Sequence, residues 1–123
     1  MTQQILLIDD DPVINFVNTK IVAKKFTDTP IFVFEDGKKA LEHIKTNSTH
    51  SFLIFLDLNM PNINGWEFLD AISLEACDFN IQVHIVTSSV DPSDRAKAAQ
   101  YKQVLTYLVK PLKASHLDNL TGI

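Results

Sequence analysis

The sequence predicts an α/β fold, a doubly wound sheet of five parallel strands with five helices, in one domain over residues 1–123. Three observations lead to this prediction. Apolar runs such as Ile5–Ile8 and Phe52–Leu56 do not alternate with polar residues, which suits strands buried on both faces of a helix-covered parallel sheet. Five such runs are separated by segments with helical spacing, as expected for right-handed crossovers. A length of 123 residues is typical of a single core.

The apolar runs define five strands, and the first helix follows the first of them. The strands are Gln4–Ile8, Pro30–Phe34, Phe52–Leu56, Ile81–Thr87 and Leu105–Val109. The first helix is expected to begin at Pro12, with Asp11 as its cap, because proline fits the first helical position. Its expected core face is Ile14, Val17, Ile21 and Val22, and the lysines left for solvent are Lys20, Lys24 and Lys25.

Each of the four other helices begins at a turn or proline signal and carries apolar residues at helical spacing. The second follows Asp36-Gly37, contains Ala40, Leu41 and Ile44, and stops near Asn47-Ser48. The third follows Asn64-Gly65 and contains Trp66, Leu69 and Ile72. The fourth is opened by Asp91-Pro92 and runs over Arg95 to Gln100. The last starts at Pro111, contains Leu112, Leu117 and Leu120, and stops at Gly122.

Composition and charge exclude several classes of protein. A net charge of -4 argues against a nucleic-acid-binding surface, so we expect no direct contact with nucleic acid. Cys77 is the only cysteine, which prevents an intramolecular disulfide and favours a reducing compartment. The amino end lacks the features of a secretory signal peptide, and no apolar window reaches the length of a membrane span. We therefore expect a cytoplasmic protein without membrane insertion.

Acidic residues follow two of the buried strands. Asp9 and Asp10 come directly after the first strand, and Asp57 comes directly after the third. Because the functional crevice of a parallel sheet lies beyond the carboxyl ends of its strands, these side chains should meet at one edge. Carboxylates that lie so close favour either protonation or a bound cation. Oxygen ligands completed by water suit Mg²⁺, so the pattern predicts a magnesium site.

A hydroxyl and an ammonium group are expected at the same edge. Thr87 ends the fourth strand, and Lys110 follows the fifth. Thr87 can donate a hydrogen bond to a phosphoryl oxygen, and Lys110 can meet both a carboxylate and a phosphate. A carboxylate that attacks phosphorus forms an aspartyl phosphate, and phosphoryl transfer mainly needs positioning and charge neutralisation. The residue set therefore suits phosphoryl transfer to an aspartate.

Four motifs stand in order along the chain. They are Ile8-Asp9-Asp10, Leu56-Asp57-Leu58-Asn59-Met60-Pro61 with Gly65, Val86-Thr87-Ser88, and Tyr107-Leu108-Val109-Lys110-Pro111. Together they resemble the receiver domain of bacterial two-component response regulators, and the resemblance covers essentially the whole chain at family spacing. It implies the flavodoxin-like (CheY-like) strand order 2-1-3-4-5.

The resemblance implies a role for each residue of the acidic edge. Asp57 is the expected phosphoacceptor, and Lys110 is expected to contact Asp57 and the phosphoryl group. Mg²⁺ is expected to bind the carboxylates of Asp10 and Asp57, the backbone carbonyl of Asn59, and a water molecule held by Asp9. The implied phosphodonor is a phosphohistidine on a sensor histidine kinase or on a histidine phosphotransfer protein.

The resemblance also implies a switch and a backbone feature. Thr87 is similar to the family's switch hydroxyl, and Tyr107 to the partner aromatic that turns inward on phosphorylation. From the residues alone, Thr87 can simply end a strand and Tyr107 can be an ordinary half-buried strand tyrosine. A cis peptide bond is implied between Lys110 and Pro111.

Two positions depart from the family pattern. Receivers usually carry Gly-Ala four and three residues before the aromatic of the fifth strand, where this chain has Gln103 and Val104. Because a left-handed helix stop is costly for most residues other than glycine, we expect the end of the fourth helix to run differently, with one additional residue. Ser89, two residues past Thr87, is small and neutral at a position that the family links to hydrolysis, so the phosphoryl lifetime stays open.

Other polar residues have structural interpretations. Asp11 is expected to be a helix cap rather than a metal ligand. The four histidines show no metal-ligand spacing, so we expect them at the surface or in hydrogen-bonded core positions. They are His43, His50, His84 and His116.

The sequence predicts a single-domain response regulator that is phosphorylated on Asp57 and signals to an unknown downstream protein, because the chain ends just past its last helix. It is expected to catalyse only its own phosphorylation and dephosphorylation. One alternative is a receiver fold that serves as an interaction module without phosphorylation. Another is a small phosphoaspartyl phosphatase, which would need a second acid at the position of Asn59 to protonate the leaving group. A flavin-binding domain is disfavoured because three glycines cannot form a phosphate-cradling loop.

Overall fold

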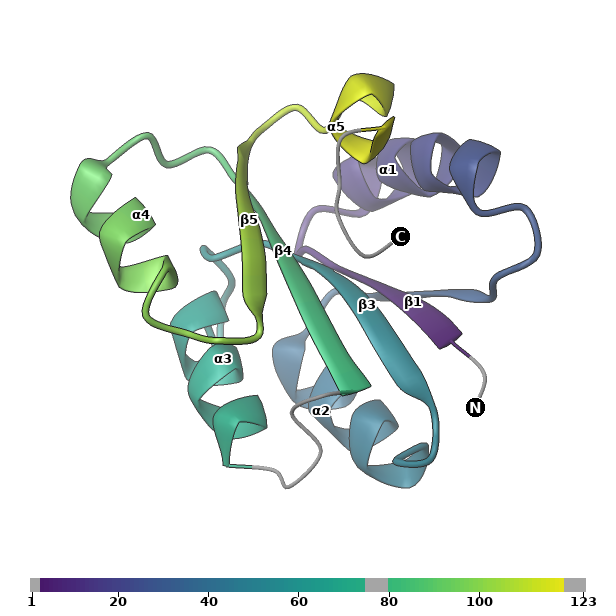
Figure 1. Cartoon of the computed structure of the whole chain (residues 1–123), viewed down its shortest axis with the longest axis horizontal. Helices are drawn as coiled ribbons and strands as arrows, with labels where there is room; N and C mark the ends of the chain where they lie inside the picture. Colours follow the sequence, from purple (N-terminus) through teal and green to yellow (C-terminus); the bar gives the residue numbers. More distant parts are fainter. Residues whose placement is uncertain (1–2, 75–79, 119–123) are drawn as a thin grey trace.

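Five parallel strands form one sheet in the order β2-β1-β3-β4-β5 (Figure 1). The structure is a computed structural model, which describes residues 3–74 and 80–118. The strands are β1 (Gln3–Ile8), β2 (Ile31–Phe34), β3 (Ser51–Leu56), β4 (Ile81–Thr87) and β5 (Val104–Val109). Each begins within one residue of its predicted start and ends where predicted. The predicted fold class and strand order are confirmed.

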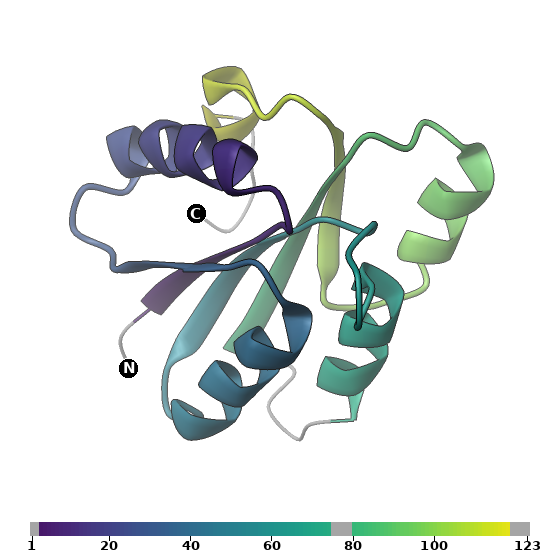
Figure 2. The ribbon, with the colours of Figure 1, turned by 180° about the vertical axis from the view of Figure 1, so that it is seen from behind.

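Helices cover both faces of this sheet. One face carries α1 (Pro12–Lys25) and α5 (Ala114–Asp118), and the other carries α2 (Gly37–Thr46), α3 (Gly65–Ser73) and α4 (Pro92–Ala98), as Figures 1 and 2 show from opposite sides. Along β1, Ile5 and Leu7 pack with the α1 and α5 side, whereas Leu6 and Ile8 pack with the other. Burial on both faces explains why β1 and β3 are continuous apolar runs. None of the described helices is long and apolar enough to cross a membrane.

Side-chain caps start the first four helices. Asp11 accepts hydrogen bonds from two backbone N–H groups in the first turn of α1, which confirms its predicted capping role. Asp36 and Asp91 accept in the same way at α2 and α4. At α3, Asn64 accepts from the N–H of Glu67 at 2.9 Å, and the Glu67 carboxylate accepts from the N–H of Asn64 at 3.0 Å. These bonds satisfy donors that a helix leaves unpaired.

The predicted core face of α1 is wrong in part. Val22 is fully buried as predicted, but Val17 is 48% exposed, and Asn15 and Asn18 are buried instead. Apolar residues of α1 lie on several sides of the helix, so their spacing does not determine which side faces the core. The observed rotation of the helix allows a tertiary contact, in which the side-chain amide of Asn15 donates to the carbonyl oxygen of Asp9 at 2.7 Å.

The start of α5 also differs from the prediction. The helix begins at Ala114 rather than at Pro111. Leu112 is buried in the core beside α1, and the Lys113 N–H donates to Nδ1 of His116 at 3.0 Å. Burial of Leu112 therefore comes before the first helical turn, which follows Lys113. The predicted Leu120 and Gly122 lie outside the described residues.

The helix α4 stops at Ala98, whereas the sequence predicted that it runs to Gln100. The next turn is closed by tighter bonds such as the one from the Tyr101 N–H to the Ala98 carbonyl, at 3.1 Å. Among the described non-glycine residues, a positive φ occurs only at Asn62 (65°). Gln103 therefore joins α4 to β5 without the left-handed backbone that glycine favours.

A β-bulge follows this connection. Val83 pairs with Val104 and His84 pairs with Thr106, so Leu105 is an additional residue in β5. The additional residue expected at the end of the fourth helix stays a prediction, because this bulge lies inside β5. His84 is a buried core histidine, and burial lowers its pKa to about 4. The predicted hydrogen bonding is met in part, since its Nδ1 lies 2.8 Å from the Thr106 hydroxyl oxygen but its buried Nε2 has no partner among the described residues.

The loop after β3 packs tightly against the start of α3. The Gly65 N–H donates to the carbonyl oxygen of Leu58 at 2.9 Å. A Cβ atom at Gly65 would lie 2.6 Å from the Leu58 Cα and 2.8 Å from the carbonyl oxygen of Asp57. Both atoms belong to the backbone and cannot move aside alone, so a side chain at Gly65 would displace the segment that carries Asp57.

We expect Gly65→Ala to destabilise the protein by about 2 kcal/mol, as overpacking against backbone typically does. Gly37→Ala is a matched control, because Gly37 also opens a helix but its Cβ would lie 3.4 Å from the nearest atom. Its effect should stay within about 1 kcal/mol and can be stabilising, since alanine favours helix. Urea unfolding followed by circular dichroism measures both values. Equal stabilities of the two variants would contradict the close packing at Gly65.

Candidate functional site

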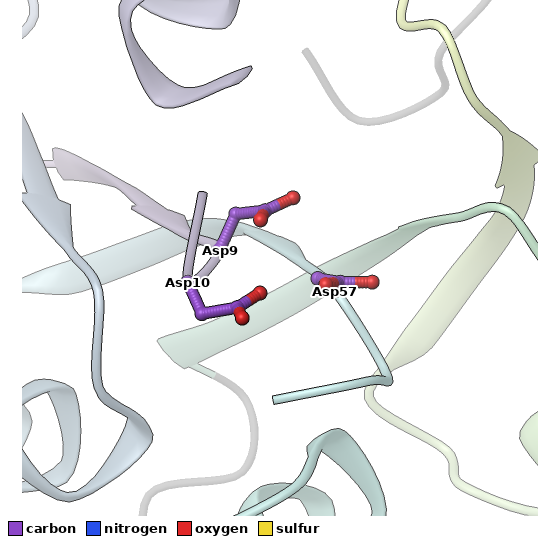
Figure 3. A group of neighbouring side chains, drawn as sticks. All are labelled: Asp9, Asp10 and Asp57. Atoms are coloured by element: carbon purple, nitrogen blue, oxygen red, sulfur yellow. The ribbon is translucent and has the colours of Figure 1, made fainter. Parts of the chain in front are cut away.

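Three carboxyl groups meet where β1 and β3 end. Asp9 and Asp10 lie in the turn after β1, and Asp57 lies directly after β3, which pairs with β1 so that Ile8 faces Leu56. Asp9 and Asp57 are each 4% exposed, whereas Asp10 is exposed. One oxygen of each carboxylate lies within 4.8 Å of the others. Figure 3 shows the three side chains gathered at these strand ends, as the strand-end rule predicted.

Lys110 reaches this acidic cluster from the end of β5. Its ammonium nitrogen lies 2.7 Å from Oδ2 of Asp9 and 3.6 Å from Oδ2 of Asp57. Its backbone N–H donates to the carbonyl oxygen of Thr87 at 2.8 Å, which fixes the end of β5 against β4. The peptide bond between Lys110 and Pro111 is cis, as predicted. One side chain therefore joins the ends of three strands.

Burial and neighbouring charge shift the pKa values of this cluster. Burial and the adjacent carboxylate of Asp9 raise the pKa of Asp57 to about 6, although the charge of Lys110 acts in the opposite direction. Burial alone would lower the pKa of Lys110, but its hydrogen bond to Asp9 and the charge of Asp57 raise it above its ordinary value. Three carboxyl groups facing one ammonium group leave excess negative charge, which a bound cation would neutralise.

The donor set fits a magnesium ion. Two ligands at about 2.1 Å from one ion are at most about 4.2 Å apart, so carboxylate oxygens need only a small movement to share an ion. The observed separations, all within 4.8 Å, lie close to this limit. The donors are hard oxygen atoms, and the exposure of Asp10 leaves room for the water ligands that Mg²⁺ retains. Asp9, Asp10 and Asp57 are the residues that can hold the ion.

Two other residues predicted for the site lie at the same edge of the sheet as the acidic cluster. Asn59, two residues past Asp57, is exposed, and its backbone N–H lies 3.4 Å from Oδ1 of Asp57. Thr87 ends β4, the strand between β3 and β5, and is fully buried. The Thr87 hydroxyl oxygen accepts a hydrogen bond from the Ser89 N–H at 3.3 Å. The fold therefore brings both residues to the edge that carries the acidic cluster.

Tyr107, the predicted switch aromatic, reaches from β5 to the loop after β4. Its hydroxyl donates to the carbonyl oxygen of Ser89 at 3.1 Å, and the guanidinium of Arg95 lies 4.7 Å from the centre of its ring. The Ser89 hydroxyl donates to Oδ2 of Asp94 at 2.7 Å. Because Ser89 also bonds to Thr87, it connects Thr87, Tyr107 and the start of α4.

Sequence reasoning missed Asn15 at this edge. Asn15 is 3% exposed, and it bonds to the backbone between Asp9 and Asp10. A polar residue at a core-facing helical position is a usable signal, but the apolar residues on both sides of Asn15 concealed which face of α1 is buried.

Comparison with protein families matches residues 5–121 to the response regulator receiver domain. The chain belongs to this family. Receiver domains are signalling domains of two-component systems rather than a classical enzyme family, and they interact with histidine kinases or phosphotransfer proteins. The predicted family is therefore confirmed.

Relatives and solved structures agree with this assignment. The receiver is 31% identical over 121 residues to a response regulatory protein of Staphylococcus epidermidis, with 98% of this chain and 45% of that protein covered. A two-component response regulator from Cytophaga hutchinsonii has a TM-score of 0.82 at 35% identity, covering 96% of this chain and 92% of that one. Chemotaxis protein CheY4 of Vibrio cholerae shares the fold, with a TM-score of 0.78 at 22% identity over 95% and 93% of the two chains. The receiver spans less than half the length of the curated relatives that it matches.

We expect Asp57→Asn to stabilise the metal-free receiver at pH 7 by roughly 1–3 kcal/mol, because the buried Asp57 must ionise against its neighbours. The pKa of Asp57 is raised from 3.8 to about 6, so ionisation costs stability as pH rises through this interval. The advantage of Asp57→Asn should therefore be complete above pH 6 and disappear below pH 3.8. Urea unfolding with a chelator across this range measures it.

The difference between the two proteins isolates Asp57, since the buried His84 contributes equally to both. Asp28→Asn is the matched control, because Asp28 is an exposed acid away from the site. It should leave the pH dependence unchanged. A wild-type protein more stable than Asp57→Asn at pH 7 would contradict the electrostatics described above.

Proposed function

We propose that this receiver accepts a phosphoryl group on Asp57 in a Mg²⁺-dependent reaction and relays it as a signal through protein contacts. The observation that carries this proposal is the position of the Asp57 carboxylate. An ammonium group lies 3.6 Å from it, and two further carboxylates have oxygens within 4.8 Å. That arrangement offers an acceptor oxygen, a cation for a phosphoryl oxygen, and ligands for a divalent ion.

In the proposed reaction an oxygen of Asp57 forms a bond to phosphorus while the phosphorus–nitrogen bond of a donor phosphohistidine breaks. The electron pair of the broken bond returns to the imidazole nitrogen. Lys110 is placed to contact the transferred group, and Asp9 holds Lys110 at 2.7 Å in that position. Thr87 can donate its hydroxyl to a phosphoryl oxygen.

Asp10 and Asp57 would bind Mg²⁺ directly, the Asn59 carbonyl would add a ligand, and Asp9 would hold a metal-bound water. The ion supplies positive charge that offsets the cluster and the incoming phosphoryl oxygens. This division of roles is supported by the exposure of Asp10 and by the ion pair that already occupies Asp9.

A route for the signal runs through Ser89. When the Thr87 hydroxyl turns to a phosphoryl group, the Ser89 N–H loses its acceptor, and the bonds from Ser89 to Tyr107 and Asp94 are free to rearrange. Tyr107 packs under Arg95 of α4, so the change reaches the α4 and β5 surface. We propose Thr87 and Tyr107 as the switch pair on this basis.

The protein phosphodonor is proposed to dock on α1. Val13, Phe16 and Val17 are 69%, 63% and 48% exposed, an unusual density of apolar surface for one helix. A groove of about 170 Å³ leads from this surface to the site, because Lys110 lies in its lining. The groove is formed by Val13, Ile14, Val17, Asn18, Lys110, Pro111 and Leu112. An apolar partner helix seated here would hold its histidine near Asp57.

The single-domain organisation expected from the sequence stays a prediction. Phosphorylation separates the main proposal from the alternative of a receiver fold that works as an interaction module without it. The acidic cluster and Lys110 favour signalling by phosphorylation, since a module that only docks on a partner needs neither of them.

We expect acetyl phosphate with Mg²⁺ to add one phosphoryl group to the wild-type protein, because Asp57 is the acceptor that the site positions. Asp57→Asn should remove this label, and a chelator should prevent it. Intact mass spectrometry counts the phosphoryl groups. Asp28→Asn provides the control, as Asp28 is an exposed carboxylate between α1 and β2, away from the carboxyl ends of the strands. Labelling that persists in Asp57→Asn would refute the acceptor assignment, and full labelling in chelator would refute the metal requirement.

We expect Phe16→Asp to slow phosphotransfer from a phosphorylated histidine phosphotransfer protein about tenfold, since a charge in an apolar contact costs at least 1.4 kcal/mol, or about a factor of ten. The rate with acetyl phosphate should not change, because the small donor does not need the α1 surface. Leu74→Asp is a matched control, being an exposed apolar residue (88%) at the far end of α3. Equal slowing by both variants would contradict docking on α1.

A further inference from the structure

Asn15 occupies an unexpected place in α1. The residues of α1 that face inward are Asn15, Asn18 and Val22, so the two positions nearest the acidic cluster are polar although they face the core. A buried amide is unfavourable unless it is hydrogen-bonded, and an apolar residue would suit the position better for stability alone. Positions that break the pattern of a fold in this way are often functional.

The contacts of Asn15 point toward the acidic cluster. Its Nδ2 donates to the carbonyl oxygen of Asp9 at 2.7 Å, and this carbonyl belongs to the peptide group that joins Asp9 to Asp10. Fixing that peptide plane fixes the directions in which both carboxylates leave the backbone. Because the bond is buried, it is stronger than a surface bond of the same length.

A small polar cavity lies beneath the cluster on the same side. Its volume is about 10 Å³, and both Asn15 and Asn18 line it together with Asp9 and Asp57. The Oδ1 atom of Asn15 is buried and has no hydrogen-bond partner among the described residues. Asn15 is thus not held by a complete set of structural bonds, and its one strong bond is to the backbone of the acidic turn.

The other contacts of the acidic turn hold the Asp9 side chain, whereas Asn15 holds its backbone. The side chain of Asp9 is held by two groups. One is the ammonium group of Lys110, and the other is the Asp11 N–H, which donates to Oδ1 of Asp9 at 2.9 Å. The peptide group between Asp9 and Asp10 receives its bond from Asn15. The direction of the exposed Asp10 carboxylate therefore depends on Asn15 more than on Lys110.

We propose that Asn15 is a positioning residue for the metal site, which orients the Asp9–Asp10 peptide so that both carboxylates face the ion. This rests on the proposed function, in which Asp10 binds Mg²⁺ directly and Asp9 holds a metal-bound water. Residues that orient ligands from outside the coordination sphere typically change metal affinity by 10–100-fold when they are removed. We expect a loss of Mg²⁺ affinity near the lower end of this range, because Asn15 acts through the backbone.

The test compares two truncations in the same helix, Asn15→Ala and Val22→Ala. Both remove a buried side chain from α1, but only Asn15 contacts the acidic turn. Mg²⁺ binding to the unphosphorylated protein is measured by titration calorimetry, and stability by urea unfolding. Asn15→Ala should weaken Mg²⁺ binding about tenfold. Val22→Ala should lower the urea midpoint and leave the Mg²⁺ affinity within twofold of wild type.

A second measurement needs no metal. Hydrogen exchange of the Asp11 amide reports the bond to Asp9, and it should become faster in Asn15→Ala but not in Val22→Ala. Asn15→Leu, which keeps the branching of the side chain without its polar atoms, provides the same comparison if Asn15→Ala does not fold. An Asn15 variant with wild-type Mg²⁺ affinity and unchanged Asp11 exchange would overturn the proposal.

The outcomes separate this inference from the proposed function. If the wild type binds Mg²⁺ and is labelled on Asp57 but Asn15→Ala binds Mg²⁺ equally well, the positioning role is wrong and the phosphoacceptor proposal stands. If the wild type is not labelled, the phosphoacceptor proposal is wrong, while the calorimetric and exchange comparisons still decide the role of Asn15.

Discussion

The attraction between Lys110 and two buried carboxylates is the interaction on which the arrangement of the site depends. It joins the ends of β1, β3 and β5, with 2.7 Å to Asp9 and 3.6 Å to Asp57. Buried ion pairs lose much of their attraction to desolvation, and here one ammonium faces three acids. The pKa of Asp57 is raised first by burial and then by the neighbouring Asp9 carboxylate, which Lys110 offsets only in part. A bound cation would therefore stabilise this site, and on the proposed function it would also offset the negative charge that a phosphoryl group brings.

The surroundings of the acids restrict their positions from two sides. On the α3 side, Gly65 lets the loop after Asp57 approach to a distance that no Cβ would allow. On the α1 side, Asn15 holds the backbone of the turn that carries Asp9. Both contacts are made with backbone atoms, so they orient whole residues and not only side-chain ends. Such preorganisation matters because phosphoryl transfer depends on geometry and charge more than on covalent chemistry.

The sequence predicts those parts of the molecule that local patterns determine. Strands buried on both faces are recognisable as apolar runs, and caps such as Asp11 and Asn64 mark helix starts. The strand-end rule brings Asp9, Asp57 and Lys110 together. The rotation of α1 and the bulge at Leu105 depend on tertiary contacts and leave no periodic signal. Asn15 was missed for a related reason. It contacts a backbone carbonyl, which every residue has, so no pattern in the sequence identifies its partner.

On the proposed function, reception and output are coupled through one backbone bond. Lys110 lines the apolar groove beside α1, and its N–H donates to the carbonyl of Thr87 at 2.8 Å. Thr87 is in turn connected through Ser89 to Tyr107. A partner in the groove and a phosphoryl group at Asp57 therefore act on the same pair of strand ends. Linkage requires that any effect of phosphorylation on the affinity for the donor be matched by an equal effect of the donor on the phosphorylated state. Release of the donor after transfer and rearrangement of the switch then have a common structural origin.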